Sequence, residues 1–183
     1  MGLPLMLVLR LLVPLLIVRW PFAGGVIAML LDGADVIIID VVGKGLFPGL
    51  EEAYFPRYHS IDKMLDMYYL SVMFWISLSW KEKIARNTSI MLFAWRTIGV
   101  ILFEITQIRF FLFLAPNLFE NFFLFYAAMR TFKPEWKVKT KKRMAIALVL
   151  LYIPKFGQEW ILHVQQAAPW NWLKETFFPW LPR

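Results

Sequence analysis

The stretch FAGGVIAMLLDGADVIIIDVVG, residues 22–43, is long and apolar enough to cross a bilayer and yet carries Asp32, Asp35 and Asp40. A spanning helix needs about 20 mainly apolar residues. A central aspartate costs roughly 2.5–3.5 kcal/mol on insertion, whereas each valine, isoleucine, leucine or phenylalanine returns about 0.3–0.6 kcal/mol. This stretch has roughly a dozen such residues, worth on the order of 3–7 kcal/mol. Because two aspartates would cancel that gain, we expect the carboxylates to find partners elsewhere in the chain.

The composition is typical of a membrane protein. The 183 residues are 60% hydrophobic and 17% aromatic, with a mean hydropathy of +0.57, whereas a soluble domain is usually about half apolar at most. The net charge of +7 would suggest nucleic acid in a soluble chain. Here the basic residues gather between apolar runs, so we expect a lipid bilayer and no nucleic acid as the partner. The absence of cysteine excludes disulfides, thiolate metal sites and cysteine nucleophiles.

The apolar runs predict an all-α fold, a polytopic transmembrane helix bundle that forms a single integral membrane domain over residues 1–183. About six membrane segments can be drawn, followed by an interfacial tail rich in Trp and Pro: about 3–20, 22–42, 61–80, 89–106, 110–130 and 144–165, with the tail at 167–183. The first segment holds Pro4, Arg10 and Pro14, and whether it crosses or lies in the interface stays open. Its apolar run also lacks a small-x-small cleavage site, so we do not expect a cleavable signal peptide.

Two features of these segments predict how they are arranged. Gly24-Gly25 allows the second helix to pack closely, and only three residues separate segments 89–106 and 110–130, which must form a tight antiparallel hairpin. The loops at 81–89 and 130–143 then lie on one side with about twice the Lys and Arg of the other side. We therefore expect both loops to be cytoplasmic in a multi-pass protein of the cell membrane, that is, the plasma or inner membrane.

Four aspartates form two pairs at helical spacing, Asp32-x-x-Asp35 and Asp62-x-x-x-Asp66. Each pair puts two carboxylates on one helix face, and two such faces could hold a divalent cation through oxygen ligands. The pairs resemble the CDP-alcohol phosphotransferases, whose motif is D-x2-D-G-x2-A-R-x8-G-x3-D-x3-D. The resemblance implies that all four aspartates are metal ligands, that Asp66 is the base activating an alcohol nucleophile, and that the substrate is a lipid.

The chain departs from this motif at several positions. Val36, Ile39-Asp40 and Tyr58 stand where the motif has Gly, Ala-Arg and Gly, and the linker is about nine residues longer. That family works at the cytoplasmic face, whereas the charge bias places these acids on the outer half. The alternative is that the acids stabilise helix contacts or cap the third helix near Ser60. His59, beside the second pair, is a further candidate ligand.

Other ionisable residues fall within the predicted segments, where each is costly and indicates a function by default. They form a predicted buried charge network: Arg10, Arg96, Glu104, Glu120, Lys155, Glu159 and His163. Such a network could lock the bundle together, carry a proton or small ion, or line an enzyme or lipid-binding pocket.

The hairpin geometries make two predictions about which of these charges meet. If the first two segments turn near Trp20–Phe22, Arg10 comes level with Gly33 and pairs with Asp32 or Asp35. The hairpin between the fourth and fifth segments brings Arg96 level with Glu120, and Lys155 returns to the same depth. One carboxylate against two cations requires Glu104, Glu159 or an acid of the second helix for balance, unless desolvation keeps the lysine neutral.

From the residues alone we expect an integral membrane protein with a buried charge network, acting as a structural, accessory or transport component. The alternative is a divergent metal-dependent lipid enzyme similar to the CDP-alcohol phosphotransferases, with a divalent cation as its cofactor. Other membrane subunits or a lipid substrate are the expected partners. The phrases PNLFEN (116–121) and PKFGQEW (154–160) also resemble stretches of small polytopic membrane proteins of bacteria.

Overall fold

All secondary structure in the described part of the chain is helical. The computed structural model describes residues 2–35, 38, 58–135, 140–161, 165 and 176. Its elements are α1 (Gly2–Leu12), the 3-10 turn η1 (Val13–Leu15), α2 (Leu16–Arg19), α3 (Pro21–Gly33), α5 (Tyr58–Leu78), α6 (Lys83–Thr106), α7 (Phe110–Leu114), α8 (Leu118–Phe132) and α9 (Lys141–Glu159). The predicted all-α class is therefore confirmed for these residues. Most of the loop at 43–60 and of the tail at 167–183 lies outside them.

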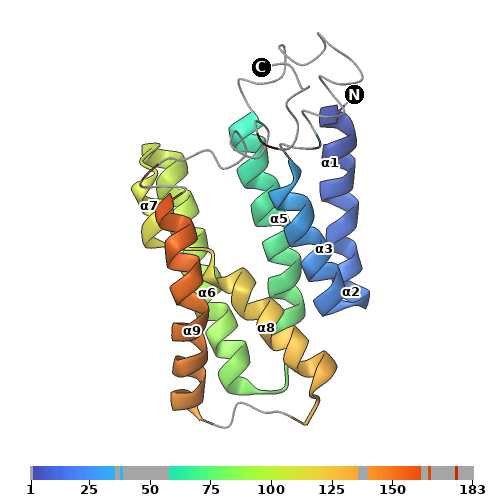
Figure 1. Ribbon diagram of the computed structural model, residues 1–183, viewed down its shortest axis with the longest axis vertical. Coiled ribbons are helices and arrows are strands. Elements are labelled where there is room, and N and C mark those ends of the chain that lie inside the picture. The colour runs from blue at the N-terminus through green and yellow to red at the C-terminus, as the bar shows by residue number, and fades with distance from the viewer. Residues whose placement is uncertain are drawn as a thin grey trace.

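The N-terminal hairpin folds as its prolines and glycines predict. Pro14 falls in the 3-10 turn that separates α1 from α2, where its missing N–H and fixed φ disfavour a continuous α-helix. The chain then reverses at Trp20, and α3 runs back beside α1 and α2 (Figure 1). A Cβ on Gly24 would lie 2.5 Å from the backbone nitrogen of Ile17. Glycine at this position therefore lets α3 approach α2 closely.

The apolar core lies where α5, α6 and α8 meet. The rings of Phe74 and Phe93 stack with centroids 4.3 Å apart, and those of Trp80 and Tyr126 are 4.1 Å apart. Helix α8 runs diagonally between α3 and α5 on one side and α6 and α9 on the other (Figure 1). It therefore joins the two halves of the bundle.

The predicted hairpin between the fourth and fifth segments is present, but its second arm is broken. Gln107 closes α6 in the left-handed conformation at φ 58°, and the chain turns into α7. Residues 115–117 then interrupt the helix before α8 begins. The segment predicted over 110–130 is therefore divided into α7 and α8, because Pro116 has no N–H and disfavours helical geometry in the residue before it.

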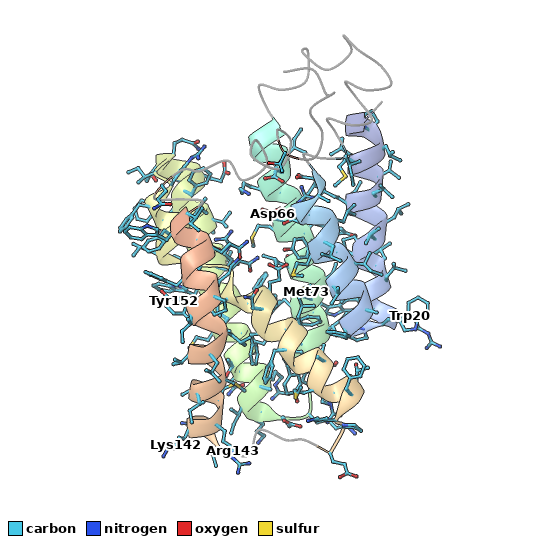
Figure 2. The ribbon with its side chains drawn as sticks, in the orientation of Figure 1. Trp20, Asp66, Met73, Lys142, Arg143 and Tyr152 are labelled. Carbon is cyan, nitrogen blue, oxygen red and sulfur yellow. The ribbon has the colours of Figure 1, made fainter. Side chains whose placement is uncertain are left out.

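Two helical runs in the described ranges, Lys83–Thr106 and Phe110–Phe132, are long and apolar enough to cross a membrane. Core helices of soluble proteins can have the same length and apolar composition, so the six membrane segments remain a prediction. The start of α6, the end of α8 and the start of α9 lie at the same end of the bundle (Figure 1). Lys142 and Arg143 mark this basic end in Figure 2.

Candidate functional site

Four aspartates from two helices surround the guanidinium of Arg10. Its Nη1 donates to Asp35 Oδ2 at 2.9 Å and to Asp62 Oδ1 at 2.6 Å. Its Nη2 donates to Asp32 and to Asp66. The predicted pairing of Arg10 with Asp32 or Asp35 is thus confirmed, and both are partners. We call these five residues, together with Lys63, the Arg10–aspartate cluster.

The helix geometry explains why these side chains meet. Asp32 lies in the last turn of α3 and Asp35 lies two residues beyond its end, and α3 runs antiparallel to the helix that carries Arg10. Asp62 and Asp66 are one turn apart on α5, so they share the face turned toward Arg10. Figure 2 shows the level of Asp66 on α5, nearer than Met73 to the end where α1 begins. The cluster therefore ties α1 to α3 and α5.

Lys63 is a member of the cluster that sequence reasoning missed. Its Nζ lies 2.9 Å from Asp62 Oδ2 and 2.9 Å from Asp66 Oδ2. The available signal was its position between the two acids of the D-x3-D pair. Two cations therefore face four carboxylates, which leaves two negative charges in excess among the described residues of the cluster.

Three of the four predicted metal ligands lie close enough together to share one ion. One carboxylate oxygen from each of Asp32, Asp62 and Asp66 lies within 4.8 Å of the others. Their side chains keep 30%, 17% and 15% of their surface exposed, whereas Asp35 is buried against Arg10. Carboxylate oxygens are the ligands that Ca²⁺ and Mg²⁺ prefer. By ligand type these three carboxylates could hold a divalent cation, and Arg10 and Lys63 already contact both oxygens of Asp62 and of Asp66.

A second set of buried polar residues surrounds the break between α7 and α8. Lys155 Nζ lies 3.1 Å from Glu159 Oε1, and this same oxygen accepts the backbone N–H of Asn117 at 3.3 Å. The Asn117 side chain donates to Glu120 Oε2 at 2.8 Å, and Arg96 Nη1 donates to the Ala115 carbonyl at 2.9 Å. We call Arg96, Asn117, Glu120, Lys155 and Glu159 the helix-break cluster.

The second cluster contains the three charges expected at one depth. Glu120 interacts electrostatically with both Lys155 and Arg96. The direct partner of Lys155 is Glu159, one of the acids expected to complete the charge balance. Glu104 is exposed on α6, so its assignment to a buried network is corrected. Asp40, His163 and the side chain of His59 lie outside the described residues.

Tyr69 connects the two clusters and was also missed by sequence reasoning. It lies three residues after Asp66 on α5 and is 3% exposed. Its hydroxyl interacts with Glu120 of the helix-break cluster and with Asp32 and Asp66 of the Arg10–aspartate cluster. The signal in the sequence was the spacing of Asp62, Asp66 and Tyr69, which places them along one helix face.

No family model, curated protein or solved structure matches this chain.

Proposed function

We propose that the chain is an integral protein of the cell membrane. Only 22% of the most apolar window of α6 is buried inside the protein. Large apolar side chains face outward on α6 and α9: Ile90, Met91, Trp95, Ile98, Ile101, Ile105, Ile146, Val149, Leu150 and Ile153. Soluble monomers rarely expose so continuous an apolar surface, and lipid chains would cover it.

The charge bias gives this proposal a direct test of orientation. Epitope tags inserted in 130–143 are expected to resist external protease in intact cells, because our proposal assigns the basic end of the bundle to the cytoplasm. Tags inserted in the loop at 43–60 are expected to be cut. The reverse pattern would overturn the proposed orientation, and protection or cleavage of both would contradict a membrane-spanning arrangement between them.

Within this membrane protein we propose that the Arg10–aspartate cluster binds a divalent cation, as the ion site of a transport or accessory component. The observation that carries the proposal is the gathering of four carboxylates against two cations. Uncompensated charge is costly in a low-dielectric interior. A divalent ion held by Asp32, Asp62 and Asp66 would offset negative charge that these three carboxylates bring together.

The test is Mn²⁺ binding by the protein in lipid nanodiscs, followed by electron paramagnetic resonance and by calorimetry. Wild type is expected to bind one ion and to gain stability with Mn²⁺, by about 2.7 kcal/mol at 100 times the dissociation constant. Asp62→Asn should weaken binding at least tenfold, because it removes a charged oxygen ligand. The matched control is Glu104→Gln, an exposed acid on α6. If wild type binds no Mn²⁺, the proposed cation site is refuted and the cluster has only a structural role, holding α1, α3 and α5 together.

A metal-dependent lipid phosphotransferase is the second candidate. It is favoured by one observation: the acids of the D-x2-D and D-x3-D pairs, far apart in sequence, meet at a single point. In this role Asp66 would take the proton of the attacking alcohol while the cation neutralises the phosphate oxygens. The assay is divalent-cation-dependent release of CMP from a CDP-linked alcohol. Cation binding by wild type without CMP release, across a panel of such substrates and acceptor alcohols, would favour the transport or accessory component.

A further inference from the structure

The break between α7 and α8 exposes backbone groups that a continuous helix would satisfy. Side chains of the neighbouring helices take over some of them. Trp95 Nε1 donates to the Leu114 carbonyl at 3.1 Å, Arg96 donates to the Ala115 carbonyl, and Glu159 accepts from the Asn117 N–H. Non-helical backbone at membrane depth is tolerated where protein groups or water satisfy it. Side chains of α6 and α9 thus stabilise the break.

Three of the four buried side-chain atoms that form no hydrogen bond among the described residues belong to α6 and to the start of α8. They are Arg96 Nε, Asn117 Oδ1 and Glu120 Oε1, in residues that are 6%, 8% and 5% exposed. Asn117 Nδ2 donates to Glu120 Oε2, so the amide oxygen Oδ1 is directed away from this carboxylate oxygen. Tyr69 approaches the same carboxylate from α5, and Oε1 remains without a partner of ordinary geometry. Such atoms cost about 1–3 kcal/mol each when they are buried and unsatisfied.

We infer that the helix-break cluster binds an internal water molecule that accepts from Arg96 Nε and donates to Asn117 Oδ1 and Glu120 Oε1. These three atoms are one hydrogen-bond donor and two acceptors. One water molecule can accept one hydrogen bond and donate two, so it can bond to all three atoms. Three hydrogen bonds are also the usual number for a buried water. The inference does not depend on a cation at the Arg10–aspartate cluster.

Ions fit these three atoms less well. The formal charges of Arg96 and Lys155 already balance those of Glu120 and Glu159, so a cation would add an uncompensated charge and would face the Arg96 N–H. An anion would face two acceptor oxygens. A bound water satisfies all three atoms without changing the charge.

The test is hydroxyl-radical footprinting by X-ray radiolysis of the full chain in lipid nanodiscs, read by mass spectrometry. Radicals formed on an internal water oxidise the side chains beside it, even when these are shielded from bulk solvent. Pro116 lies in the break, and Pro14 is a matched buried proline in η1, away from the helix-break cluster. Pro116 is expected to be oxidised at least tenfold faster than Pro14. Equal rates, whether both slow or both fast, would overturn the inference.

Two leucine variants identify the residues that hold the water. Asn117→Leu removes the acceptor and adds apolar bulk, so oxidation of Pro116 should fall to the rate of Pro14. Asn121→Leu, four residues further along α8 and only half-buried, should leave the oxidation of Pro116 unchanged. Rapid oxidation of Pro116 in folded Asn117→Leu protein would contradict the assignment. If that variant does not fold, the comparison of the two prolines in wild type still decides the inference.

Discussion

Replacing Arg10 with leucine should be among the most damaging single changes in the chain. The guanidinium is 4% exposed and bonds to all four aspartates of its cluster. Without it, Lys63 is the one cation of the cluster, among the described residues, that still faces those carboxylates. Loss of one partner from a buried ion pair costs about 3–5 kcal/mol. For a domain of this size that corresponds to a fall in Tm of about 6–20 °C.

The assay is thermal unfolding in nanodiscs, followed by tryptophan fluorescence, at neutral pH and without divalent ions. Arg19→Leu is the matched control, because Arg19 is an exposed arginine of the same hairpin. Adding Asp35→Leu to Arg10→Leu should recover part of the loss, since it removes the most buried of the four carboxylates that Arg10 contacts. An Arg10→Leu protein as stable as the Arg19→Leu control would refute the reasoning and the cluster with it.

Two further changes test the packing and the second cluster. Lys155→Met should lower the free energy of unfolding by about 3–5 kcal/mol, because it removes the cation paired with the buried Glu159. Chemical unfolding should show that Glu159→Leu in the same chain restores part of the loss. Gly99→Ala should cost about 1–3 kcal/mol, because its new Cβ would overlap the side chain of Ala115. Gly33→Ala, with nothing within 4 Å of the added Cβ, should change the melting temperature little.

The local parts of the structure could be predicted from the sequence. Helical class follows from long apolar runs, and a hairpin turning near Trp20 is enough to bring Arg10 level with the acids of α3. Gly24 predicts a close helix contact because any side chain there would collide with the neighbouring backbone. These features depend on residues a short distance apart in the chain.

Other features depend on contacts that the sequence pattern does not specify. Asp62 and Asp66 reach Arg10 because α5 packs beside α1. The sequence of either helix alone does not predict this packing. The break in the fifth segment did have a local signal in Pro116. Apolar length alone favours a single segment over 110–130, and prolines are tolerated in membrane helices whose neighbours satisfy the backbone.

The direct measurement of the cation site is anomalous scattering from crystals grown with Mn²⁺. The account predicts one anomalous peak in contact with carboxylate oxygens of Asp32, Asp62 and Asp66, at roughly 2.0–2.6 Å from each as for hard divalent ions. The peak should vanish in Asp62→Asn crystals and persist in Glu104→Gln crystals. Ordered Arg10–aspartate density with no peak at these three carboxylates would contradict the account.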